Sequence, residues 1–188
     1  MVSILDRIDL GETRAVLFVG FGRGDEISRF SNRLVRDATI YGVEIDPGLV
    51  EIARKRLSRL PQKLELRTAK AQSLPYESGS MDLVFCKIVL SEIPDWERAL
   101  AEMARVLKPS GRLILIDFVS YNPDWLTISR DAHPGFDIEV VIRELRANGM
   151  RVLKREDAAG KGTIGSLDGE RLGVETFFMT AIKENEND

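Results

Sequence analysis

Short, mainly apolar runs alternate with amphipathic segments along the first two thirds of the chain. The runs at 16–19, 39–43, 64–66, 81–86 and 113–116 are typical of strands in a parallel sheet. After the first run, Ile27, Phe30 and Leu34 recur at helical spacing. Five such alternations predict an α/β fold with a doubly wound, mostly parallel sheet. The ligand crevice of such a sheet lies at the carboxyl ends of its strands.

Capping residues mark the expected ends of two helices. Asp46 followed by Pro47 is typical of an N-cap with proline in the first turn. Asn148 and Gly149 are typical of the end of a helix that includes 138–145. Beyond it, the pattern predicts strands at 150–154 and 176–182, and a glycine-rich loop over 158–173.

Composition narrows the class of protein. The chain has 188 residues, 44% of them hydrophobic and 30% charged, which predicts one globular domain over 1–188. Its net charge of −3 gives no general attraction to nucleic acid or to an anionic membrane, and no run approaches the ~20 apolar residues of a membrane span. Cys86 is the single cysteine, so we expect no disulfide, no cysteine-built zinc site and a cytoplasmic protein, and we assign no residue as a metal ligand.

A glycine-rich turn follows the first apolar run. In Gly20-Phe21-Gly22-Arg23-Gly24, the missing Cβ atoms let a ligand lie against the backbone at the start of a helix. The glycines recur in steps of two, whereas the dinucleotide fingerprint needs its last glycine where Asp25 stands. This spacing disfavours a nicotinamide cofactor. A tight turn without a ligand is the structural alternative.

An acidic residue ends the second predicted strand. Glu44 follows Gly24 by twenty positions, where a carboxylate can accept hydrogen bonds from both ribose hydroxyls of an adenosine. Asp46 competes for that role, although its place before Pro47 suits helix capping better. We therefore favour Glu44.

Four segments together resemble the class I S-adenosylmethionine-dependent methyltransferases, especially the small-molecule group that includes ubiquinone-biosynthesis and arsenite methyltransferases. The segments are 16–24 with the glycine turn, 41–47 with Glu44, 71–76 leading into 81–84, and Arg105-Val106-Leu107-Lys108-Pro109-Ser110-Gly111. Their order and spacing are specific to this family.

The resemblance implies a Rossmann-like, seven-stranded sheet with a C-terminal antiparallel hairpin, and S-adenosyl-L-methionine as cofactor. It implies that the glycines approach the methionine part, Glu44 the ribose, and Ile45 with the backbone of 71–72 the adenine. By resemblance, the cofactor-binding residues are Gly20, Phe21, Gly22, Gly24, Glu44, Ile45, Ala71, Gln72 and Lys87.

Three positions depart from the family pattern. Phe18 replaces the acid that the family usually carries two positions before its first glycine. Lys70 stands where an aspartate is usual, and Ser91-Glu92 replaces a frequent pair of histidines. The first two departures bear on cofactor affinity.

Methyl transfer from a sulfonium depends mostly on positioning and on excluding water, so a catalytic triad is not required. The catalytic residues are unknown, and Lys87 and Glu92 are the candidates on the acceptor side. His133, the only histidine, lies in a predicted loop, as does Trp125, which could line an acceptor pocket. Arg23 could meet the cofactor carboxylate or could simply be solvated.

Fifteen residues precede the first predicted strand, so the domain is expected to lack an N-terminal lid. Either the acceptor is large, or the loops at 120–135 and 158–173, with or without a second subunit of a homodimer, close the pocket. The favoured function is methyl transfer to a small-molecule acceptor, and the alternative is an adenosyl-binding module without turnover. A nucleic-acid methyltransferase is less favoured because no basic, aromatic-interleaved stretch is present.

Overall fold

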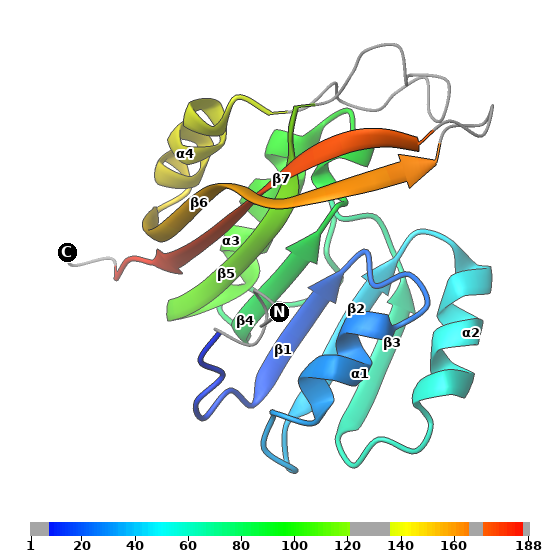
Figure 1. Ribbon diagram of the computed structural model, residues 1–188. Helices are drawn as coiled ribbons and strands as arrows, with labels where there is room; N and C mark the ends of the chain where they lie inside the picture. The colour runs from blue at the N-terminus through cyan, green and yellow to red at the C-terminus, as the bar shows by residue number, and fades with distance from the viewer. Residues whose placement is uncertain (1–7, 121–135, 166–170, 186–188) are drawn as a thin grey trace.

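The computed structural model describes residues 8–120, 136–165 and 171–185, which form one seven-stranded sheet (Figure 1). The strand order is β3-β2-β1-β4-β5-β7-β6, with β7 antiparallel to both of its neighbours. This confirms the predicted doubly wound, mostly parallel sheet and its C-terminal antiparallel hairpin. The strands are β1 Ala15–Val19, β2 Thr39–Glu44, β3 Lys63–Thr68, β4 Met81–Lys87, β5 Leu107–Ser120, β6 Met150–Gly165 and β7 Arg171–Lys183.

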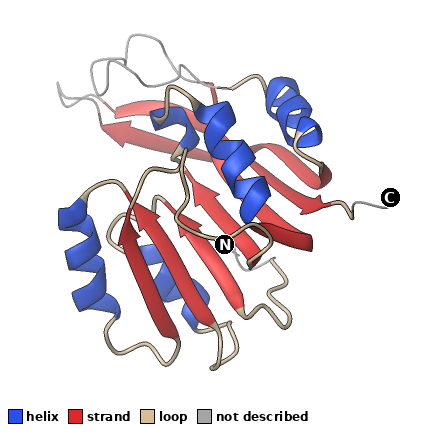
Figure 2. Ribbon diagram, turned by 180° about the vertical axis from the view of Figure 1, so that it is seen from behind, coloured by secondary structure: helices blue, strands red, loops and turns tan. Residues whose placement is uncertain are grey.

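Helices cover both faces of the sheet, as seen from behind in Figure 2. One face packs against α1 and α2, and the other against α3 and α4. The helices are α1 Asp25–Ser31, α2 Pro47–Leu57, the 3-10 turn η2 Leu90–Glu92, α3 Trp96–Val106 and α4 Ile138–Ala147. None of the helices in the described ranges is long and apolar enough to cross a membrane.

Successive side chains of β1 point to opposite faces of the sheet. Leu17 and Val19 join the core under α3 and α4, whereas Val16 and Phe18 join the core under α1 and α2. The Phe18 ring packs edge-on against Phe30 of α1, with 5.2 Å between ring centroids. Aromatic packing on the α1 side therefore explains why an apolar residue is stable at position 18.

The predicted caps agree with the structure. The Asp46 carboxylate accepts hydrogen bonds from the backbone N–H groups of Gly48 and Leu49, with Pro47 as the first residue of α2. At the other predicted cap, α4 ends at Ala147 and is followed by Asn148 and Gly149, the latter with φ of +69°. Only a residue that tolerates positive φ suits this last position.

Two local predictions were wrong. The first helix ends at Ser31, so Leu34 is buried outside it. The glycine-rich segment 158–173 is mostly strand, because β6 continues to Gly165 and β7 begins at Arg171. Pairing between adjacent antiparallel strands satisfies backbone hydrogen bonds whatever the side chains, and so overrides weak local propensity.

Candidate functional site

A cavity of about 720 Å³ lies at the carboxyl ends of β1, β2 and β4. This is the topological switch point of the sheet, because β2 and β3 lie on one side of β1 and the later strands lie on the other side. This is the position at which open α/β sheets bind ligands, and the volume suits a cofactor-sized molecule. The cavity is lined by Val19, Gly20, Gly22, Val43, Glu44, Ile45, Ala69, Lys70, Ala71, Gln72, Ile88, Val89, Glu92, Ile93, Pro94 and Asp95.

The glycine turn forms the floor between β1 and α1. Gly20 and Gly22 have φ angles of +64° and +53°, a region that residues with a Cβ rarely adopt. A Cβ on Gly20 would overlap the Val89 side chain, whereas a Cβ on Gly22 would enter open space. Gly20 therefore permits close packing of the cavity wall, and Gly22 presents bare backbone to a ligand.

Glu44 ends β2 with its side chain at the cavity and 9% of its surface exposed. Its Oε2 accepts a hydrogen bond from the Gly22 N–H at 2.9 Å, and its Oε1 accepts from the N–H groups of Ile45 at 2.8 Å and Asp46 at 3.3 Å. A carboxylate offers about four acceptor positions. Two ordinary backbone hydrogen bonds and the long contact from Asp46 thus fix the group, and one acceptor position on each oxygen is left for the hydroxyl donors of a ligand.

An apolar surface adjoins Glu44. Ile45 is 65% exposed, which is unusual for a large apolar side chain, and it lines the cavity together with Ala69 and Ala71. Lys70 and Gln72 complete this wall. A flat, weakly polar ring placed here would cover apolar surface that otherwise faces water.

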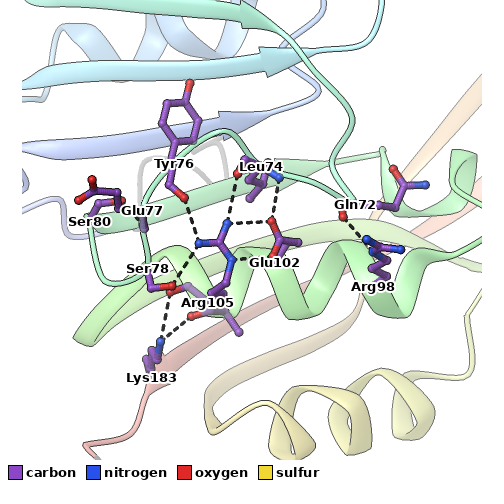
Figure 3. Close-up of polar contacts among 11 residues, drawn as sticks. Gln72, Leu74, Tyr76, Glu77, Ser78, Ser80, Arg98, Glu102, Arg105 and Lys183 are labelled. Carbon is purple, nitrogen blue, oxygen red and sulfur yellow. Dashed lines mark hydrogen bonds and ion pairs between the residues drawn. The ribbon is translucent and has the colours of Figure 1, made fainter.

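The wall that carries Ala71 and Gln72 is held by charged residues of α3 (Figure 3). The Arg105 guanidinium donates hydrogen bonds to the carbonyl oxygens of Leu74, at 3.2 Å, and Tyr76, at 3.0 Å, and to Glu102. Glu102 in turn accepts from the Leu74 N–H at 2.8 Å. Arg105 and Glu102 therefore fix a loop without secondary structure against a rigid helix.

This network makes a testable prediction about pH. Hydrogen bonding and charge from Arg105 outweigh burial and hold the pKa of Glu102 below its ordinary value of 4.5. A lowered pKa in the folded state adds stability above pH 4.5, and that stability is lost as the pH falls through the lowered pKa. We expect Glu102→Gln to lose less free energy of unfolding than the wild type between about pH 6 and about pH 3 in urea titrations. Arg105→Leu should flatten the same part of the profile, and an unaltered profile in both variants would contradict this role.

The opposite wall follows β4 and depends on Asp117, near the end of β5. The fully buried Asp117 carboxylate accepts hydrogen bonds from the N–H groups of Val89 at 3.1 Å, Leu90 at 3.0 Å and Ser91 at 3.3 Å through Oδ2, and from Phe118 through Oδ1. Burial raises the pKa of this carboxyl group. Ile88, which precedes these donors, has φ of +52°, a strained value for a β-branched residue. Asp117 thus stabilises a strained segment of the cavity wall.

The structure brings together most of the residues that the sequence singles out. Gly20, Gly22, Glu44, Ile45, Ala71, Gln72 and the acceptor-side candidate Glu92 all line the large cavity. Phe21 and Lys87 line a smaller adjoining cavity, together with Phe18. Gly24 is not among the residues that line these two cavities, and a Cβ there would contact Leu57 of α2. His133 and Trp125 lie outside the described residues.

Sequence reasoning assigned Arg105 no role beyond its place in the fourth family segment, and it missed Asp117. Arg105 has a signal, because it follows Glu102 by three positions on one helix face and so predicts an ion pair. Asp117 also has one, because a carboxylate directly after the apolar run 113–116 must find partners if that strand is buried. Neither signal reveals which backbone segment the charged side chain binds.

Comparison with known proteins gives the class. A family model described as a methyltransferase domain matches residues 17–115, more than half of the chain. The chain therefore belongs to the methyltransferase domain family.

Two relatives define the similarity further. A demethylmenaquinone methyltransferase from Deinococcus radiodurans is 33% identical over 105 residues, which are 56% of this chain and 43% of that protein. A ubiquinone/menaquinone biosynthesis C-methyltransferase from Citrifermentans bemidjiense is 28% identical over 114 residues, 60% of this chain and 48% of that protein. The matches thus span less than half the length of these relatives.

Solved structures agree on the fold. An S-adenosylmethionine-dependent methyltransferase from Methanosarcina mazei has a TM-score of 0.70 and 19% identity, covering 94% of this chain and 95% of that one. The [4+2]-cyclase SpnF has a TM-score of 0.71 and 20% identity, covering 90% of this chain and 75% of that one.

S-adenosylmethionine is the cofactor that the family implies, and the cavity fits it. Glu44 retains acceptor capacity for ribose hydroxyls, exposed Ile45 and buried Ala71 offer an apolar wall to an adenine, and the space beside Gly22 is open. When bound, the cofactor supplies an electrophilic methyl group on a sulfonium. The residues around it would hold and orient the cofactor.

Proposed function

We propose that this chain transfers a methyl group from S-adenosylmethionine to a small organic acceptor, with residues 1–188 forming one domain. The observation that carries the proposal is Glu44, fixed by three backbone N–H groups at the edge of a 720 Å³ cavity. Such a carboxylate is suited to the paired hydroxyls of a ribose. Placing the adenosine there directs the rest of the cofactor toward the glycine turn.

The far wall of the cavity supports a weakly polar acceptor. Ile88, Val89, Ile93 and Pro94 provide apolar surface, and Glu92 is an exposed carboxylate among them. The names of both relatives described above contain a quinone, and a quinone-type ring has the apolar faces and polar edge that this wall favours. We propose that Glu92 contacts the acceptor's polar edge.

The single buried cysteine, Cys86, accords with a reducing, cytoplasmic setting.

The test uses a methyl-labelled donor. The full chain is incubated with S-adenosylmethionine and with a panel of hydroquinones, phenols and amines, and labelled products are separated by chromatography. We expect label in at least one ring hydroquinone or phenol, and less of it with Glu92→Gln. The absence of cofactor binding to folded protein would contradict the proposal.

A binding module without turnover is the second candidate. It is supported by the apolar residue at position 18. The [4+2]-cyclase among the structural neighbours is an instance of this fold in a protein named for a reaction other than methyl transfer. Tight binding of the cofactor together with no labelled product across the panel would favour this candidate over a transferase.

A further inference from the structure

A second cavity of about 220 Å³ adjoins the large one at the glycine turn. The two cavities share Val19, Gly20 and Gly22 as lining residues. The smaller cavity also has an apolar part from Phe18 and Phe85, and charged groups from Glu26 and Lys87. A ligand that extends past Gly22 from the Glu44 side would therefore meet a charged end.

The charged end is an ion pair between α1 and β4. Glu26 Oε1 accepts a hydrogen bond from Lys87 Nζ, and the Glu26 side chain is only 18% exposed. Its second oxygen, Oε2, is buried and accepts no hydrogen bond within the described part of the chain, although Arg29 Nη1 lies 3.5 Å away as an ion-pair partner. Glu26 is thus oriented by Lys87, and because Oε2 is buried, the acceptor position left for a ligand is the second lone pair of Oε1.

Strand β1 cannot supply a negative charge to this cavity. The Phe18 ring is 1% exposed, with its centroid 5.2 Å from that of Phe30 and 5.5 Å from that of Phe85. Among the residues that line the smaller cavity, the carboxylates are Asp25 and Glu26, and Asp25 is bound to Arg56 at 2.7 Å. Glu26 is therefore the carboxylate available to a cation bound there.

We propose that Glu26 receives the α-ammonium group of the cofactor's amino-acid end and that Lys87 is a positioning residue that orients Glu26. The inference rests on the proposed function, because it requires the adenosine to lie beside Glu44. Beyond its sulfur the cofactor carries an ammonium and a carboxylate, and a buried carboxylate with a free acceptor position binds an ammonium more strongly than a neutral donor. The smaller cavity thus selects ligands that have the complete amino-acid end.

The test compares two ligands that share the adenosyl thioether. S-adenosylhomocysteine has the amino-acid end, and methylthioadenosine has a methyl group in its place. Calorimetry on the full chain should show that Glu26→Gln weakens the binding of S-adenosylhomocysteine about tenfold. The affinity for methylthioadenosine should change by less than about twofold. Lys87→Met should show a smaller effect in the same direction. Glu51→Gln, which removes an exposed carboxylate of α2, is the matched control and should bind both ligands like the wild type.

Equal weakening of both ligands by Glu26→Gln would overturn the inference, since a structural role would affect them alike. A second measurement needs only the wild type, so it does not depend on how well a variant folds. Decarboxylated S-adenosylhomocysteine, which keeps the ammonium, should bind at least about tenfold more tightly than the deaminated analogue. The opposite order would overturn the role of Glu26. If the wild type bound none of these ligands, the proposed function itself would fail.

Discussion

Replacing Glu44 with alanine should weaken the binding of S-adenosylhomocysteine by about a hundredfold, which corresponds to about 3 kcal/mol of binding free energy. The carboxylate is proposed to accept hydrogen bonds from both ribose hydroxyls, and it also fixes the glycine turn through the Gly22 N–H at 2.9 Å. Its loss removes ligand contacts and loosens the backbone beneath them. Isothermal titration calorimetry on the wild type and the variant measures the effect.

Asp46→Asn is the matched control for Glu44→Ala. Asp46 is an acidic residue two positions away, but its carboxylate caps α2 by accepting from Gly48 at 2.7 Å. Asparagine caps helices about as well as aspartate, so affinity should stay within about twofold of the wild type. A larger loss in Asp46→Asn than in Glu44→Ala would reassign the ribose contact to Asp46.

Asp117→Asn should lower the free energy of unfolding by about 3 kcal/mol. The amide keeps the shape of the side chain, but its NH₂ group must face either the N–H groups of Val89 to Ser91 or that of Phe118. Buried donors are then left without an acceptor, and the strained backbone at Ile88 loses its support. Urea unfolding followed by circular dichroism gives the change, and cofactor affinity should fall as well.

The same substitution at Asp137 tests whether burial causes the effect. Asp137 caps α4 by accepting from the Glu139 N–H at 2.9 Å at an exposed site, where asparagine serves equally well. Asp137→Asn should therefore lower the free energy of unfolding by less than about 0.5 kcal/mol. Similar small losses in both variants would show that the Asp117 carboxylate does not hold the cavity wall.

The sheet and the cavity floor were predictable because their signals are local. Apolar runs such as 113–116 specify buried strands, and the glycine turn specifies backbone that other residues cannot adopt. The reach of β6 to Gly165 was not predictable, since it depends on pairing with β7 rather than on the segment's own pattern. The C-terminal antiparallel hairpin came from the family resemblance, because periodicity does not determine which strands are neighbours.

The contacts that support the site could not be predicted from the sequence for a related reason. Asp117 and Val89 are far apart in sequence, and only the parallel pairing of β4 with β5 brings them within hydrogen-bond distance. The direction of the Phe18 side chain is likewise a property of the sheet. Position 18 faces α1, so its ring packs with Phe30 and Phe85 instead of filling the large cavity.

A crystal structure of the protein with S-adenosylhomocysteine tests the central claim most directly. We expect the ribose hydroxyls within hydrogen-bond distance of the Glu44 carboxylate, the adenine against Ile45 and Ala71, and the sulfur directed toward the glycine turn. Density for the ligand outside this cavity, or an empty cavity at saturating ligand, would contradict the assignment of this cleft as an adenosyl-binding site.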